Sequence, residues 1–151
     1  MPGLEDLYRE IILDHYRSPR NRGDLPVPPA VMAEGHNPLC GDEIQIYLQV
    51  ADGVVSDVKV GGQGCSISQS SASMMSAAVK GKAIADVRSL VRRFKSMMSI
   101  EDDDASPVPD VKLGDLEALQ GVVKFPVRIK CATLAWNTLL NALDEASTAT
   151  A

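Results

Sequence analysis

Apolar residues near the start of the chain recur every three or four positions, which is the spacing of one face of a helix. The pattern predicts an amphipathic helix of about four turns that ends near Ser18-Pro19, because proline disfavours helix continuation. His15 lies at the polar border of this face and is interpreted as a packing or capping residue. The apolar positions are Leu4, Leu7, Tyr8, Ile11 and Ile12.

A strict alternation of apolar and polar residues follows, which is typical of half-buried strands. It runs through residues 43–50, and after the tight-turn signal Asp52-Gly53 it resumes over residues 54–60. Prolines at positions 26, 28 and 29 mark an extended segment that leads into a short edge strand near residues 30–35. Together these segments predict a three-stranded antiparallel meander.

Helical patterns occupy the remainder of the chain. We expect helices over residues 66–79, 84–98, 113–119 and 131–146, separated by the glycine-rich stretch 61–64, the break at 80–82 and an acidic, proline-containing loop at 101–110. Residues 146–151 are small and polar, and we expect a frayed tail there. The order predicts one α+β domain over residues 1–151, in which helices pack on one face of a three-stranded antiparallel sheet.

Composition excludes several classes of function. The net charge is −5, from 15 basic and 20 acidic residues, and such a field repels nucleic acid. The densest basic stretch, residues 88–95, is interpreted as a solvated helix face. No apolar run reaches the roughly 20 residues that a membrane span needs. Residues 1–10 carry acids and lack the apolar core of a signal peptide, so we expect a cytoplasmic protein.

The three cysteines are the clearest candidates for chemistry. Their odd number excludes a fully paired disulfide framework. Cys40 lies in a turn with Pro38 and Gly41, Cys65 directly precedes a predicted helix, and Cys131 is expected to open the last one. A helix start favours the thiolate form, so these positions are typical of ligating or reactive thiols.

Three thiolates and the carboxylate of Asp42 form a donor set that suits a tetrahedral zinc ion. The separations between the cysteines follow no zinc-finger spacing, and the chain has no CxxC pair. From the residues alone, two interpretations therefore remain open. The cysteines either share one metal site or occupy three separate boundaries and never meet.

Two other kinds of site find little support in the pattern. The stretch 61–64 lacks the Lys-Ser/Thr that completes a phosphate-binding loop, and we see no histidine–acid pair near the serines of residues 66–73. His36 lies four residues before Cys40, yet we interpret it as a polar loop histidine rather than a ligand.

Three segments together resemble the signatures of the IscU/NifU-like scaffold family of iron–sulfur cluster assembly. The opening segment at residues 7–21 also resembles that family, so the likeness spans nearly the whole chain. Lys130 stands where IscU-type scaffolds carry histidine, and residues 84–120 form an extra stretch; both features are typical of the SufU branch. The segments are Asn37-Pro38-Leu39-Cys40-Gly41-Asp42, Gly62-Gln63-Gly64-Cys65-Ser66-Ile67-Ser68 and Arg128-Ile129-Lys130-Cys131-Ala132-Thr133-Leu134.

The resemblance implies a function and a ligand set. SufU-like proteins bind zinc through three cysteines and an aspartate, which here are Cys40, Cys65, Cys131 and Asp42. They take persulfide sulfur from a SufS-like pyridoxal-phosphate cysteine desulfurase, which they stimulate, and a SufB-containing assembly complex is the expected acceptor. Arg128 matches a position near the site in that branch, and we expect it to stabilise a cysteine or persulfide anion.

The resemblance leaves the first sulfur acceptor and the exact role open. We predict Cys40 as the acceptor, because a Pro/Gly loop swings more easily than the start of a helix; Cys131 is the alternative, since IscU relatives use their last cysteine. The competing functions are a scaffold that builds a [2Fe–2S] cluster on the same ligands and a structural zinc module. Lys130 favours sulfur transfer over the scaffold, because the histidine ligand is missing.

Overall fold

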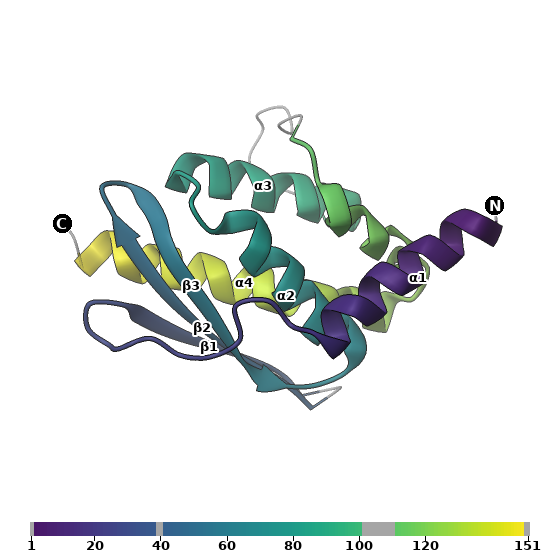
Figure 1. Cartoon of the computed structure of the whole chain (residues 1–151), viewed down its shortest axis with the longest axis horizontal. Coiled ribbons are helices and arrows are strands. Elements are labelled where there is room, and N and C mark those ends of the chain that lie inside the picture. The colour runs from purple at the N-terminus through teal and green to yellow at the C-terminus, as the bar shows by residue number, and fades with distance from the viewer. Residues whose placement is uncertain (1, 39–40, 101–110, 150–151) are drawn as a thin grey trace.

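A computed structural model describes residues 2–38, 41–100 and 111–149. Three strands follow the first helix, and the remaining helices come after the strands (Figure 1). The elements are helix α1 Pro2–Arg17, strands β1 Val31–Asn37, β2 Asp42–Ala51 and β3 Val54–Gln63, helices α2 Ser66–Val79 and α3 Ile84–Met97, the 3₁₀ helix η1 Gly114–Lys124 and helix α4 Pro126–Ala149.

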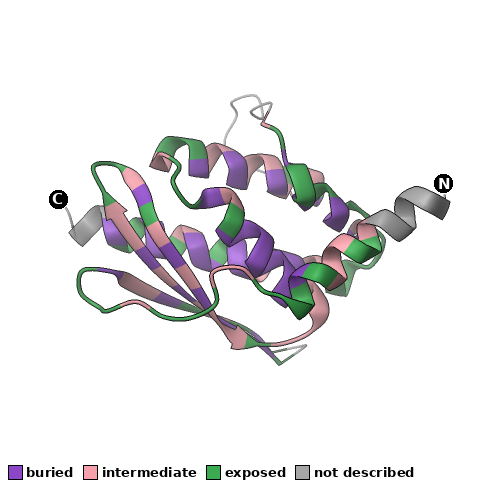
Figure 2. Cartoon of the chain, viewed as in Figure 1, coloured by how far each residue is buried: buried purple, intermediate pink, exposed green. Residues whose placement is uncertain are grey.

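The strands form one antiparallel sheet in the order β1-β2-β3. The apolar set of β2 is buried, and it alternates with half-buried or exposed neighbours such as Gln45 and Tyr47. Helices α4 and α2 pack on the buried face, so the purple residues of the helices and the sheet in Figure 2 face one another. The predicted α+β class, with helices on one face of a three-stranded antiparallel sheet, is confirmed.

Aromatic stacking and a short hydrogen-bond chain join the helices within the core. The rings of Phe94 on α3 and Trp136 on α4 stack with centroids 4.3 Å apart. The Trp136 indole N–H donates to Ser71 Oγ on α2 at 3.1 Å, and the Ser71 hydroxyl donates to the carbonyl of Ala132 at 2.6 Å. These contacts hold α2 against α4. Cys65 directly precedes α2, and Cys131 lies in α4.

A second polar link holds α1 in place. Imidazole Nδ1 of His15 lies 2.8 Å from Ser73 Oγ on α2, and its Nε2 lies 3.3 Å from a carboxylate oxygen of Asp115 on η1. The packing role expected for His15 therefore agrees with its burial. The expectation that no histidine–acid pair lies near the serines was wrong, but Ser73 is itself buried and accepts the Arg20 N–H at 2.8 Å. This arrangement joins three elements.

The last helix begins earlier than expected, at Pro126 rather than Cys131. Proline is well suited to the first turn of a helix, because its fixed φ is helical and that turn needs no N–H donor. The N–H groups of Arg128 and Ile129 both donate to the carbonyl of Phe125. Cys131 therefore lies in the second turn of α4, and the prediction that it opens a helix was wrong.

Smaller differences concern the ends of other elements. Strand β1 runs to Asn37, and the short helix expected at 113–119 is a 3₁₀ helix that continues to Lys124. Helix α4 continues to Ala149 with Ala146 buried, so the chain does not fray at 146. Residues 150–151 and the acidic loop predicted at 101–110 lie outside the described residues. None of the described helices combines the length and apolar character that a membrane span requires.

Gly35 lets β1 approach α4 closely. A Cβ atom at this position would overlap Thr138 Oγ1 and would lie 3.1 Å from Leu134 Cδ1. We expect Gly35→Ala to lower the free energy of unfolding by about 1–3 kcal/mol, because the strand must move away from the helix. Denaturant unfolding checks this, with Gly121→Ala as the control, since a Cβ there meets nothing within 4 Å. Equal losses in both variants would contradict the close-approach argument.

Candidate metal centre

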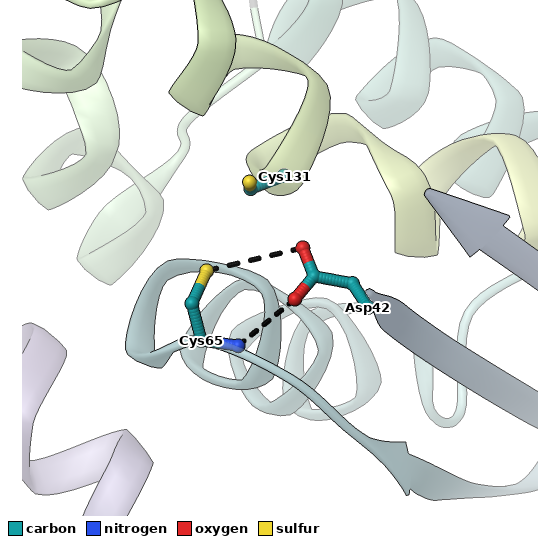
Figure 3. Close-up of side chains that lie close together, drawn as sticks. All are labelled: Asp42, Cys65 and Cys131. Atoms are coloured by element: carbon teal, nitrogen blue, oxygen red, sulfur yellow. Dashed lines mark hydrogen bonds between the residues drawn. The ribbon is translucent and has the colours of Figure 1, made fainter. Parts of the chain in front are cut away.

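Asp42, Cys65 and Cys131 converge from three elements that are distant in sequence (Figure 3). Asp42 begins β2, Cys65 is the residue that precedes α2, and Cys131 projects from α4. Their ligand atoms, one carboxylate oxygen and two sulfurs, all lie within 4.8 Å of one another. The sequence left open whether the cysteines share one site or lie apart. The structure brings two of the cysteines and the aspartate together in one cluster.

Cys40, the third predicted thiol, lies outside the described residues. The described chain on both sides of it is anchored beside the cluster. Asn37, the last residue of β1, pairs with Asp42 in the sheet register, and the N–H of Gly41 donates to the carbonyl of Asn37 at 2.8 Å. Gly41 has a φ of +68°, a conformation that favours glycine and that the turn requires.

Asp42 is almost fully buried, with only 1% of its surface exposed. The backbone N–H of Cys65 donates to one carboxylate oxygen at 2.9 Å, and the Cys65 thiol donates to the other at 3.9 Å. The carboxylate also faces the N-terminus of α2, where the helix dipole favours negative charge. A buried carboxylate needs such partners, because burying it without compensation is costly.

Gly64 makes room for this carboxylate. A Cβ atom on Gly64 would overlap Asp42 Oδ1 and would lie 2.7 Å from Ser68 Oγ. Only a residue without a side chain therefore lets the β3–α2 connection pass over the aspartate. Sequence reasoning placed Gly64 in a signature segment but did not assign it this role.

Cys131 is held on two sides within the protein. Its side chain is fully buried. The Asn37 amide donates to its sulfur at 3.8 Å, and the thiol donates to the carbonyl of Val127 at 3.7 Å. Asn37 is a site residue that sequence reasoning missed, although its place in the 37–42 segment, at the end of a strand before a turn, was an available signal. Cys65, by contrast, is half-buried.

Arg128 adds a positive charge at the edge of the cluster. The negative charge of Cys65, and after it that of Cys131, raises the pKa of the Arg128 guanidinium, and a hydrogen bond to Cys65 raises it further. Because this side chain is exposed, its charge faces both the thiols and the solvent. The structure thus brings Arg128 together with two predicted cysteines, whereas His36 lies on exposed β1 surface near Glu34 and stays apart from the cluster.

The donor set fits a soft or borderline divalent ion. Two sulfurs and one carboxylate oxygen favour zinc over magnesium or calcium, which prefer oxygen ligands alone. A tetrahedral zinc with bonds of about 2.0–2.3 Å keeps its ligand atoms about 3.3–3.8 Å apart. The ligand atoms of the cluster, which lie within 4.8 Å of one another, are close to that spacing, and a fourth ligand is still required.

Most of the chain is similar in sequence to known proteins of iron–sulfur cluster assembly. The family model described as NifU-like N terminal domain matches residues 7–132. The zinc-dependent sulfurtransferase SufU of Bacillus subtilis is 48% identical over 136 residues, which cover 90% of this chain and 88% of that protein. The iron–sulfur cluster assembly scaffold protein IscU of Streptococcus pyogenes is 38% identical, with 97% and 88% covered.

A solved structure agrees with these relatives. It is described as a putative iron–sulfur cluster assembly scaffold protein for the SUF system from Fervidobacterium islandicum. It superposes with a TM-score of 0.76 at 32% identity and covers 89% of this chain and 94% of its own. The sequence resemblance to the IscU/NifU-like family is therefore confirmed, and the chain shares its fold with a solved member.

Gly64→Ala should displace the Asp42 carboxylate and thereby weaken metal binding, with little loss of secondary structure. We expect it to lose zinc to a chelator at least about tenfold faster than the unchanged protein, as Asp42→Ala also should, because each removes one ligand. Chelator competition with a colorimetric zinc indicator measures the rate. Asp57→Ala is the control, since this aspartate of β3 pairs with Lys80, the residue that follows α2, and does not belong to the cluster. Unchanged zinc release in Gly64→Ala would contradict the role of the aspartate.

Proposed function

The chain belongs to the NifU-like N-terminal domain family, and from that premise we propose that it is a zinc-dependent sulfur-transfer protein of iron–sulfur cluster assembly. It takes persulfide sulfur from a cysteine desulfurase and passes it to the complex that builds the cluster. The observation that carries this proposal is the convergence of Asp42, Cys65 and Cys131 beside the cation of Arg128. The name of the Bacillus subtilis relative, a zinc-dependent sulfurtransferase, supports it.

Zinc would be held by Asp42, Cys65 and Cys131, with Cys40 as the proposed fourth ligand. Bound zinc supplies positive charge that keeps cysteine thiols deprotonated at neutral pH. The N-terminus of α2 and the Arg128 guanidinium add positive charge at this place. Without a bound cation, thiolates gathered beside the buried Asp42 carboxylate would repel one another.

The transfer step is a thiol–persulfide exchange. The acceptor thiolate attacks the terminal sulfur of the desulfurase persulfide, a new S–S bond forms, the old one breaks, and the desulfurase cysteine leaves as a thiolate. The terminal sulfur keeps its proton or yields it to solvent, so no external oxidant or reductant is needed. The product is a persulfide on the acceptor cysteine and a regenerated desulfurase thiolate.

We propose Cys40 as the acceptor. An acceptor sulfur must be reached by a large partner, and Cys131 is fully buried and contacts Asn37 and Val127. Cys65 is half-buried, and both its amide and its thiol are engaged with Asp42. These contacts argue against either of them, including the alternative Cys131, as the first thiol to leave the site.

Arg128 is proposed to stabilise the anions of the exchange. Its exposed guanidinium lies beside both described thiols, and it presents several N–H donors to a thiolate or persulfide anion. Charge-assisted hydrogen bonds of this kind are about twice as strong as neutral ones. An arginine at the solvent edge can therefore hold the incoming persulfide without closing the site.

Assembly of a [2Fe–2S] cluster on the same residues is the second candidate function, because several similar proteins are named IscU scaffolds. Lys130, next to Cys131, argues against it, since a protonated lysine is no substitute for a histidine ligand. Purified protein separates the two: zinc without colour supports sulfur transfer, and a brown chromophore after reconstitution supports the scaffold.

The partners follow from the transfer function. A SufS-like pyridoxal-phosphate cysteine desulfurase would be the donor, whose turnover the protein stimulates, and a SufB-containing complex would be the acceptor. Both are proposed from the family, and the exchange would take place in the cytoplasm with these partners. Unchanged desulfurase turnover on addition of the protein would favour a structural zinc module.

Cys40→Ala should abolish sulfur acceptance, because the attacking thiolate is removed. We expect the persulfide yield to fall at least about a hundredfold, with partial loss of zinc, since one of four ligands is gone. Mass spectrometry after incubation with desulfurase and cysteine measures the yield and maps the modified residue. Asp57→Ala, at a residue outside the cluster, again serves as the control variant. Full acceptance in Cys40→Ala, with the sulfur mapped to Cys131, would reject the assignment.

A further inference from the structure

A groove of about 760 Å³ lies directly beside the thiol cluster. Side chains from α1, the first turn of α2, η1 and the first turn of α4 line it. Two of these residues connect it to the cluster: Ser66 follows Cys65 in sequence, and Arg128 is the cation beside both described thiols. Anything bound in this groove is therefore next to the two described thiols.

Most residues that line the groove are apolar. Ile12 of α1, Ile67 of α2 and Phe125, the residue before α4, are among the residues that line it. Phe125 is 60% exposed, and nearby Val127 is 57% exposed. Large apolar side chains with such exposure are uncommon in the described part of the chain. Phe125 thus adds an exposed aromatic ring to the lining of the groove, and an exposed apolar patch marks an interaction surface.

The charge of the groove is opposite to that of the chain. Arg9, Lys124 and Arg128 line it, and none of the described residues that line it is acidic. Within the described part of the chain, none of the three forms an ion pair with a carboxylate. The whole chain carries a net charge of −5, so three cations without a carboxylate partner among the described residues are a strong local departure.

We propose that this groove is the docking site for a segment of the cysteine desulfurase that carries an apolar anchor flanked by acidic side chains. The proposal rests on the proposed function and deepens it, because it assigns the surface by which the sulfur donor is held. Phe125, Ile12 and Ile67 receive the anchor, and Arg9 and Lys124 pair with the acids. Exposed aromatic and arginine side chains around a hollow are typical of the residues that contribute most to binding.

Other occupants fit the observations less well. A two-fold dimer formed through this groove would bring the same basic patch of both copies together. Its cations are Arg9, Lys124 and Arg128, and like charges at an interface are repulsive. Nucleic acid would meet only three cations on an acidic protein. The adjacency to Cys65 and Arg128 favours the one partner that must approach the thiols, which is the sulfur donor.

Binding of the purified, pyridoxal-phosphate-loaded SufS-like desulfurase of the same organism to zinc-loaded variants tests the proposal. We expect Arg9→Glu, Lys124→Glu and Phe125→Ser each to raise the Kd about tenfold or more. Arg17→Glu is the matched control, because Arg17 is equally exposed on α1 and does not line the groove. Arg17→Glu should change the Kd less than about threefold. Added salt should weaken desulfurase binding by the unchanged protein more than it weakens binding by Arg9→Glu.

Two parallel measurements separate this proposal from the proposed function. Zinc content and sulfur acceptance from a small persulfide, cysteine persulfide, should stay unchanged in the groove variants, because neither requires docking. Unchanged desulfurase affinity in Arg9→Glu, Lys124→Glu and Phe125→Ser would overturn the groove while leaving sulfur transfer intact. Failure of the unchanged protein to accept sulfur from either donor would instead reject the proposed function.

The remaining outcomes also decide the question. An equal loss of affinity in Arg17→Glu would overturn the proposal, since overall charge and not the groove would then govern binding. A change of oligomeric state confined to the groove variants would assign the surface to a second copy of the chain. Normal desulfurase binding with impaired delivery to the downstream complex would assign it to the later partner.

Discussion

The burial of one carboxylate organises the centre of this protein. Asp42 is removed from water where a strand, a helix start and the last helix meet, and a buried negative charge is tolerated only with close donors and a cation. The Cys65 amide supplies one donor, and the N-terminus of α2 adds a favourable field. Two thiols facing the same point strengthen the demand for positive charge. A soft divalent ion would therefore balance the negative charge that the fold gathers at Asp42, Cys65 and Cys131.

The frame around this region is rigid on the side of α2 and α4. The chain of hydrogen bonds from Trp136 through Ser71 to Ala132 fixes the two helices at the residue that follows Cys131. Asn37 extends this fixation to the sheet, because its side chain contacts the Cys131 sulfur while its backbone closes the turn at Gly41. A sulfur held by α4 and by the end of β1 is suited to remain a ligand, and a site of exchange needs at least one such fixed point.

Much of this arrangement was predictable from local pattern, and the rest was not, for identifiable reasons. Alternation in residues 43–50 and the Asp52-Gly53 turn predicted the sheet, because strand periodicity and turn chemistry are local. The convergence of Asp42, Cys65 and Cys131 came from resemblance to a family and not from their spacing, since contacts across the whole chain leave no local signal. The start of α4 at Pro126 was missed because the apolar periodicity becomes clear only beyond Cys131. The link between His15, Ser73 and Asp115 joins residues 58 and 100 positions apart, and no periodicity encodes it.

The metal site and the groove beside it differ in the sign of their charge. Inside the site the chain supplies negative and potentially negative groups, whereas the adjoining groove supplies Arg9, Lys124 and Arg128. Arg128 belongs to both, because it lines the groove and its pKa is raised by the thiols. An acidic partner segment paired with Arg9 and Lys124 would leave the Arg128 guanidinium beside the thiols. Recognition of the partner and stabilisation of the sulfur anions would then fall to different cations of the same groove.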